Sequence, residues 1–245
     1  MQANTLLKAL TLISVSLTSF SSQAAEPDLG LNGSGELGFT DSSGNTTSTT
    51  LFAALELNYN QAHYAIKSKF ETNYKSEDHV QTEERYLIDV QHNRYYNPEH
   101  NYYSFVGGKF EKNRFAGIEL DTILSLGLGR QLFKNEATKL IGEAGLAQQE
   151  TSYTDDVIED DQSQTAIRLK LDLTHQINAQ VAFSQDITYL NGTQQITIES
   201  NTGFKVKVAD RMNLKASYKY RHNDSPATGV KKTDTQTLLT LIYDF

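Results

Sequence analysis

Hydrophobic and polar residues alternate along most of this chain. The clearest case is residues 212–221, where apolar Met212, Leu214, Ala216, Tyr218 and Tyr220 alternate with polar Asn213, Lys215, Ser217, Lys219 and Arg221. Successive side chains of a β-strand point to opposite faces of a sheet, so this alternation indicates strands with one apolar and one polar face. The same pattern recurs in residues 64–74, 167–173 and 196–208.

Clusters of turn-forming residues separate these segments, and no linker or change of composition divides the chain. The pattern predicts one all-β domain, a closed antiparallel transmembrane β-barrel of about twelve strands, because single-chain outer-membrane barrels have an even strand number. The predicted strands are 31–40, 47–59, 63–75, 82–95, 101–112, 120–133, 138–152, 164–175, 179–190, 195–208, 212–222 and 233–245.

The first 24 residues have the features of a secretory signal peptide. Lys8 is the one charged residue in the first ten, residues 9–20 are apolar apart from Ser and Thr, and Ser22-Gln23-Ala24 places small residues where a signal peptidase reads. The apolar run is too short to cross a bilayer as a helix. We therefore expect residues 1–24 to be cleaved and residues 25–245 to form the barrel.

A soluble β-sandwich would also alternate, so other features must distinguish lipid from water. The longest expected connections, 153–163 and 223–233, are the seventh and the eleventh. Both would face outward if the termini lie in the periplasm. Aromatic residues also gather near the predicted strand ends, as interfacial girdles require. They are Tyr59, Tyr64, Tyr74, Tyr95, Tyr96, Tyr102, Tyr103, Tyr189, Tyr218, Tyr220, Tyr243 and Phe245.

The chain end supports the same interpretation. Apolar residues stand at alternate positions up to a terminal aromatic residue, namely Leu239, Leu241, Tyr243 and Phe245. This resembles the C-terminal signal that the barrel-assembly machinery of Gram-negative bacteria reads. We therefore expect the cell outer membrane as the location, with that machinery, outer-membrane lipid and lipopolysaccharide as partners.

Composition narrows the class further. The chain has no cysteine, so disulfide bonds do not hold an exported fold together. Its formal charge is −8, which argues against a nucleic-acid partner. No apolar run in the mature region approaches the ~20 residues of a spanning helix.

Several segments resemble a known family. They are the glycines at 33, 35 and 38 before residues 41–47, the segment 113–119, and Gly127-x-Gly129. Over residues 33–245 the chain resembles a family of unknown function whose members are described as salt-induced outer-membrane proteins. The resemblance implies a membrane barrel with an outer-membrane address, and no substrate. This sequence departs from the family pattern at two positions. Asp121 stands where an arginine is common, and Arg130 stands where an aromatic residue is common. A role that the family's arginine has at the first position is therefore not assigned to this chain.

Catalytic chemistry is not predicted. Lipid-modifying barrel enzymes place His and Ser two positions apart, and none of the six histidines here is followed by Ser at that spacing. His222 and Asp224 suit a solvated loop better than a protease site, because the paired-aspartate partner that such a site also needs is not evident. Scattered histidines and absent cysteines predict neither a metal nor a cofactor. The acidic run 155–161 lacks the glycine spacing of a calcium loop, which favours a solvated loop over a cation site.

The polar face is the candidate functional surface. Basic residues concentrate on three predicted strands: Lys205, Lys207, Lys215, Lys219, Arg221, Arg168 and Lys170. Acidic residues occupy inward positions elsewhere: Glu36, Glu56, Glu71, Asp89, Glu111, Glu143, Asp172 and Asp186. The two sets either create a transverse field across an open pore or form ion pairs that fill a narrow barrel. Two functions follow: a small passive channel for polar or anionic solutes, or a closed structural barrel that supports the envelope under salt stress.

Overall fold

The computed structural model describes residues 29–42, 48–97, 99–155 and 160–245. The signal peptide expected over residues 1–24 lies outside the described residues, as does part of the acidic run 155–161. No helix in the described ranges is long and apolar enough to cross a membrane, a finding that concerns helices alone.

Twelve strands form in the described chain, and all twelve were predicted. Their bounds are β1 Gly30–Ser42, β2 Ser48–Asn60, β3 Tyr64–Glu77, β4 Val80–Tyr95, β5 Tyr102–Asn113, β6 Ile118–Lys134, β7 Thr138–Tyr153, β8 Gln162–Gln176, β9 Val181–Gly192, β10 Ile196–Lys207, β11 Met212–Asn223 and β12 Thr233–Asp244. Each bound differs from the prediction by at most two residues. A 3-10 turn, η1 (Arg114–Ala116), joins β5 to β6.

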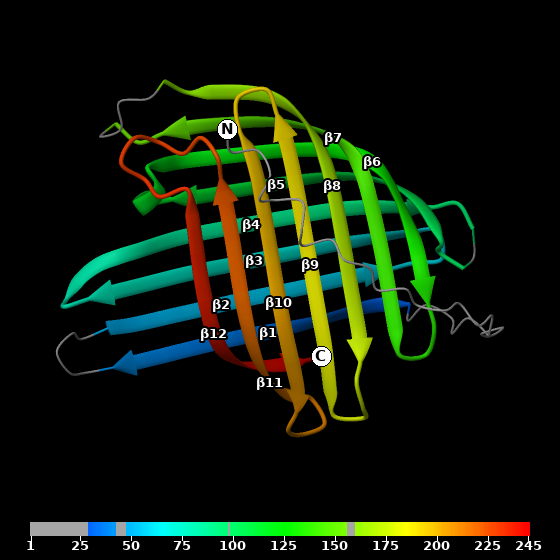
Figure 1. Ribbon diagram of the computed structural model, residues 1–245. Helices are drawn as coiled ribbons and strands as arrows, with labels where there is room; N and C mark the ends of the chain where they lie inside the picture. The colour runs from blue at the N-terminus through cyan, green and yellow to red at the C-terminus, as the bar shows by residue number, and fades with distance from the viewer. Residues whose placement is uncertain (1–28, 43–47, 98, 156–159) are drawn as a thin grey trace, which may run out of the picture.

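The strands close into one antiparallel barrel in which each pairs with its sequence neighbours and β1 pairs with β12. Figure 1 shows strands β1–β6 crossing β8–β12 at a steep angle, as tilted strands on opposite walls of a barrel do. The longest connections are β7–β8 and β11–β12, as predicted. We call the end that carries them the loop end, and the opposite end, where Gly30 and Asp244 lie, the terminus end.

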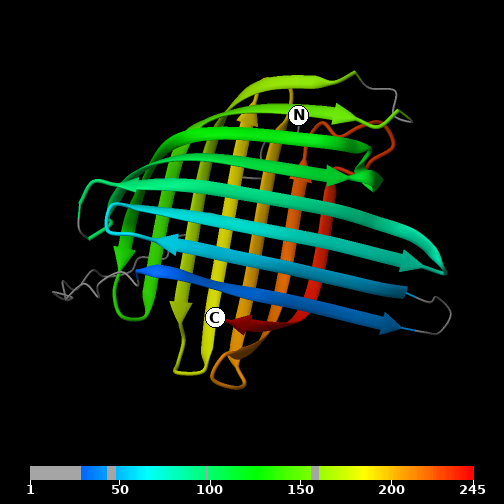
Figure 2. The ribbon, with the colours of Figure 1, turned by 180° about the vertical axis from the view of Figure 1, so that it is seen from behind.

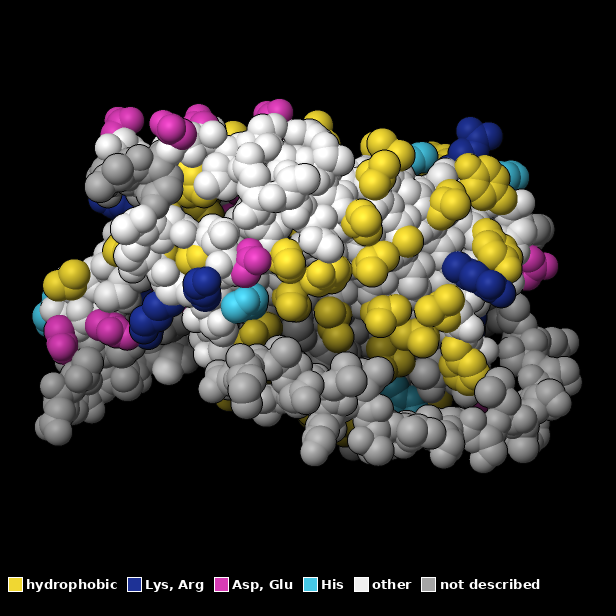
Figure 3. All heavy atoms as spheres, turned by 45° about the horizontal axis from the view of Figure 1, so that its top comes forward, with side chains coloured by type: hydrophobic (Ala, Val, Ile, Leu, Met, Phe, Trp, Pro, Cys, Tyr) yellow, Lys and Arg dark blue, Asp and Glu magenta, His cyan; other side chains and the backbone are white. Residues whose placement is uncertain are grey.

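Burial in this barrel is the reverse of burial in a soluble protein. Leu126 and Leu128 point outward with 64% and 67% of their surface exposed, whereas the inward Glu111 is 3% exposed. In Figure 3 hydrophobic side chains gather on the outer face, and most charged ones lie toward the two ends. An apolar outer belt around a polar interior is the arrangement of a barrel in lipid. The all-β transmembrane architecture predicted from alternation is confirmed.

One part of the predicted aromatic girdle is wrong. Tyr96, Tyr102 and Tyr218 point outward and are half exposed, but Tyr103 is 3% exposed and points into the barrel. The prediction placed adjacent tyrosines together, although neighbours on a strand must face opposite ways. Tyr103 consequently belongs to the interior, together with Tyr95, which stands opposite it in register and packs edge-on against its ring.

The last strand closes the ring against the first. Register runs from Ser34 opposite Asp244 to Leu37 opposite Leu241. Gly33 and Phe245 add two backbone hydrogen bonds of 2.9 Å. Leu239, Leu241, Tyr243 and Phe245 all point outward and are half exposed. Their role as an assembly signal stays a prediction.

Candidate functional site: the charged lumen

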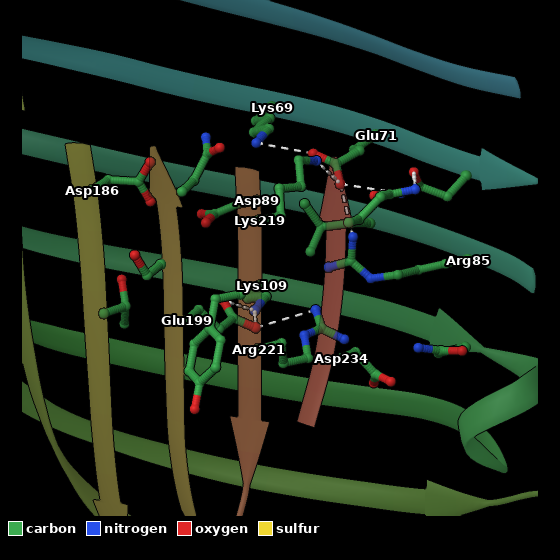
Figure 4. A pocket seen from close by; sticks show the side chains of 18 of the residues that line it. Lys69, Glu71, Arg85, Asp89, Lys109, Asp186, Glu199, Lys219, Arg221 and Asp234 are labelled. Carbon is green, nitrogen blue, oxygen red and sulfur yellow. Dashed lines mark hydrogen bonds and ion pairs between the residues drawn. The ribbon is translucent and has the colours of Figure 1, made fainter. Parts of the chain in front are cut away.

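A cavity of about 1180 Å³ occupies the lumen. Its wall reaches the loop end at Lys75 and Glu77 and extends toward the terminus end at Asn58 and Lys67. The wall is polar because alternation sends every second residue of each strand inward, and those positions are mostly polar. Figure 4 looks into this cavity.

Eight charged side chains form one connected cluster across the cavity, which we call the charge layer. Its cations are Lys69, Arg85, Lys109, Lys219 and Arg221, and its carboxylates are Glu71, Glu111 and Glu199. Five cations against three carboxylates leave an excess of two positive charges. The side chains of Glu71 and Glu111 are almost fully buried, at 3% and 4% exposure.

The charge layer joins opposite walls of the barrel. Nη2 of Arg221 on β11 lies 2.8 Å from Oε2 of Glu111 on β5, six positions away in the ring of twelve. Nζ of Lys109 lies 2.7 Å from both carboxylate oxygens of Glu199 on β10, five positions away. Since these contacts span the ring, the lumen is crossed by side chains at this level.

Two shared carboxylates hold the layer together. Glu71 on β3 contacts Lys219, Arg85 and Lys69 at 2.7, 2.7 and 3.0 Å. Glu111 contacts Arg221, Arg85 at 2.9 Å and, more weakly, Lys109 at 3.9 Å. Figure 4 shows Lys219 and Arg85 directed at Glu71 from different strands. Each of these buried carboxylates contacts several cations, and the contacts offset the free-energy cost of removing its charge from water.

The seven predicted basic residues do not all reach this cavity. Lys219 and Arg221 belong to the charge layer, and Arg168 and Lys170 line the same cavity. Lys215 instead pairs with Glu36 at 3.1 Å. Lys205 and Lys207 line a separate cavity of about 400 Å³ at the terminus end, where they lie 3.3 Å from Asp244 and 3.6 Å from Asp210.

Three layer cations, Lys69, Arg85 and Lys109, were missed as candidates. They stand at inward positions of β3, β4 and β5, so alternation alone would have found them. The prediction instead followed strands with several basic residues.

A second network lies nearer the terminus end. Glu143 accepts hydrogen bonds from Tyr103 Oη at 2.7 Å, from Gln91 Nε2 at 2.8 Å and from Arg168 Nη1 at 2.8 Å. Tyr103 stands opposite Gly129, where an added Cβ would overlap the tyrosine ring. The second glycine of the Gly127-x-Gly129 segment therefore makes room for the inward tyrosine.

Charged side chains without an ion pair also line the cavity. Glu56, Asp89, Asp172 and Asp186 line it together with Lys67 and Lys170. Among the described residues, none of these six has an oppositely charged side chain within 4 Å. Four carboxylates against two ammonium groups give these six an excess of two negative charges, equal and opposite to the excess of the charge layer. Glu56 and Asp89 both lie opposite Lys69 in register, and Asp89 also lies opposite Lys109, so these carboxylates border the layer.

The residues considered for other chemistry have structural contacts. Asp224 accepts a hydrogen bond from the Ile196 amide at 2.6 Å, and Nδ1 of His222 lies 2.8 Å from the Thr233 hydroxyl. Asp121 accepts hydrogen bonds from Thr151 and Gln149 at 2.6 and 2.9 Å. The described part of the chain contains no group of three or more His, Asp or Glu placed to hold a metal ion.

A family model described as "Protein of unknown function, DUF481" matches residues 35–245. The chain belongs to this family. The predicted resemblance to a family of unknown function is thereby confirmed. A comparison with curated proteins found no match for it.

Solved structures similar to this DUF481 member include two proteins of the outer membrane. The NanC porin is 11% identical with a TM-score of 0.51, covering 87% of this chain and 98% of the porin. An outer-membrane channel from Pseudomonas putida F1 is 9% identical with a TM-score of 0.51, covering 94% of this chain and 100% of the channel. At these identities the likeness establishes a shared barrel fold.

Proposed function

We propose that this protein is an outer-membrane channel that passes small polar solutes and prefers anions. The observation that carries the proposal is the charge layer, where five cations and three carboxylates meet in the middle of the lumen. A solute that crosses the barrel must pass these side chains. Fixed charge at a constriction selects permeating ions because little water screens it there.

The outer surface supports the location. An apolar belt surrounds a polar interior, and the fold is shared with a porin and a channel of the outer membrane. With both termini in the periplasm, the loop end faces outward. In that orientation a solute from outside enters the cavity from the loop end, where Lys75 and Glu77 line its wall.

The size of the expected preference follows from Coulomb's law. A unit charge about 5 Å from a permeating ion contributes about 0.8 kcal/mol in water. It acts with opposite sign on anions and cations, so one charge changes their relative permeability by roughly fifteenfold without salt and by roughly threefold to tenfold when 0.1 M salt screens it. The carboxylates that line the cavity without an ion pair, such as Glu56 and Asp89, oppose this preference.

The test is the zero-current potential of the refolded protein in a planar bilayer under a salt gradient. Lys219→Gln removes one layer cation and leaves Glu71 paired with Lys69 and Arg85, so we expect the anion preference to fall. The matched control is Lys205→Gln, a lysine at the terminus end outside the main cavity, which should leave the potential unchanged. Equal effects of the two substitutions would contradict the assignment of selectivity to the charge layer.

The competing function is a closed structural barrel without transport. It requires the charge layer to seal the lumen completely, and it predicts no current from a protein that is demonstrably folded. Folding is checked by heat-modifiable migration in gel electrophoresis.

A further inference from the structure

The contact between the first and last strands is much shorter than any other in the barrel. Only four register pairs join β1 to β12, whereas each other neighbouring pair of strands shares at least eleven. The paired portion lies at the terminus end, between Ser34 and Leu37 on β1 and between Leu241 and Asp244 on β12. The seam between these strands is therefore closed at one end only.

Toward the loop end the two strands separate. Figure 1 shows the C-terminal part of β12 running beside β1 and the rest turning away with β11, and Figure 2 shows the same bend from behind. The backbones are still close at Gly38, where an added Cβ would lie 2.8 Å from Cγ2 of Thr240. Beyond that point, each strand pairs only with its other neighbour, which leaves two backbone edges facing a gap.

The lumen cavity reaches this gap. Its wall includes Thr40 of β1, Thr50 of β2 and every residue of β12 from Thr233 to Leu238. The side chains of a fully paired strand reach the lumen at alternate positions, and such strands contribute at most three consecutive residues to this wall, as at 67–69 of β3. A run of six consecutive lining residues therefore marks the exposed edge of a strand. The gap thus connects the cavity sideways with the surroundings of the barrel.

The gap lies at the level of the interfacial aromatic residues. Thr237 stands opposite Tyr218, which is 47% exposed on the outer surface. On the other side, Phe39 is in register with Leu51, which is in register with Tyr74, 41% exposed. Outward tyrosines mark the boundary between hydrocarbon and headgroups. The gap therefore opens among headgroups, with apolar surface directly below it.

The chemistry of the gap suits hydroxyl-rich groups. The side chains around it are mostly hydroxyls and an amide, from Thr40, Thr50, Thr235, Gln236 and Thr237, with the carboxylate of Asp234 nearer the loop end. Below it, Leu37 and Leu239 expose apolar surface to the bilayer. Sugar hydroxyls both donate and accept hydrogen bonds, so a sugar can pair with these side chains and with the free backbone groups of the two strand edges.

An inserted peptide strand fits less well. β1 and β12 run antiparallel to each other, so one strand placed between them would be parallel to one of the two. Every neighbouring pair in this barrel is antiparallel, and parallel pairing is slightly weaker. We propose that the gap is a lateral binding site for the sugar headgroup of an outer-leaflet glycolipid, whose acyl chains stay on the apolar surface below. This site goes beyond the proposed channel function and does not depend on conductance.

Two cysteine pairs test the geometry in a chain that has no cysteine of its own. Gly38→Cys with Thr240→Cys joins positions at the closed part of the seam and should form a disulfide on oxidation. Thr40→Cys with Leu238→Cys places cysteines on the separated edges and should remain reduced, because a disulfide needs Cα atoms within about 7 Å. Equally complete disulfide formation in both pairs would mean that the seam is closed and would overturn the proposal.

Site-specific photo-cross-linking in a lipopolysaccharide-containing outer membrane tests the occupant. A photoreactive residue replaces Gln236, which faces the lumen beside the gap. The control position is Asn201, which also lines the cavity and lies on the same register line through Lys219, two strands from the seam. We expect a lipopolysaccharide adduct at 236 and none at 201. Adducts at neither position, equal adducts at both, or a protein adduct at 236 would each refute the glycolipid site.

Discussion

The most informative single substitution is Glu111→Gln, because it changes the charge of the layer with little change of shape. Glu111 is 3% exposed and contacts Arg85, Arg221 and Lys109. Glutamine keeps the volume and one acceptor oxygen but removes the negative charge. The excess positive charge of the layer consequently rises from two to three.

The stability cost can be bounded from the contacts that remain. Breaking a buried ion pair typically costs about 3 to 5 kcal/mol because the remaining charge is left without a partner. Here Arg85 keeps Glu71, and Arg221 and Lys109 keep Glu199. We therefore expect a loss below that range, about 2 to 3 kcal/mol, and a protein that still folds.

The selectivity should move in the opposite direction from that of Lys219→Gln. One additional positive charge raises the permeability of anions relative to cations by roughly threefold to tenfold at 0.1 M salt, where the Debye length is about 10 Å. At 1 M salt the Debye length is about 3 Å, so the effect should largely disappear. The zero-current potential in planar bilayers at both salt concentrations measures this change.

Glu36→Gln is the matched control. Glu36 is also a buried lumen carboxylate, with partners Lys215 and Thr240, but it lies outside the charge layer. Glu36→Gln should lower the free energy of unfolding without changing the zero-current potential. An unchanged potential in Glu111→Gln, or the same shift in Glu36→Gln, would refute the reasoning that places the selective charge in the layer.

Two further predictions concern other parts of the barrel. Tyr103→Phe removes the hydrogen bond to Glu143 and should lower the unfolding free energy by about 1 to 3 kcal/mol. Gly129→Ala displaces the same ring. In urea titrations, the double substitution should therefore lower the unfolding free energy by less than the sum of the two single substitutions. Leu126, at the centre of β6, is 64% exposed, and Leu126→Arg should lower the unfolding free energy in lipid vesicles by about 2 to 4 kcal/mol. Leu120→Arg, near the strand end, should lower it by about 1 kcal/mol or less. Equal losses would argue against a lipid-facing belt.

Strand positions could be predicted almost completely, because each strand carries its own alternation. Residues 212–221 alternate without a break, and β11 spans Met212–Asn223. The same alternation decides whether a side chain points into the barrel or outward, as Tyr103 demonstrates, since neighbours on a strand face opposite ways. This parity of position along the strand is a local property, so one sequence suffices to read it.

The charge layer could not be predicted, because its contacts join strands that are distant along the chain and around the ring. Arg221 and Glu111 are both inward by parity, but their contact depends on the tilt and cross-section of the closed barrel. Alternation left open whether the lumen charges face water or one another. The open seam could not be predicted either, because hydrophobic and polar residues alternate along β1 and β12 whether or not the two strands pair.

The central claim is that solutes cross this barrel through the charge layer. Single-channel recording of the refolded wild-type protein in a planar bilayer under a salt gradient tests it most directly. We predict discrete current steps and a zero-current potential of the sign that anion preference gives. A folded, heat-modifiable barrel that passes no current would contradict the claim and would identify the charge layer as a seal.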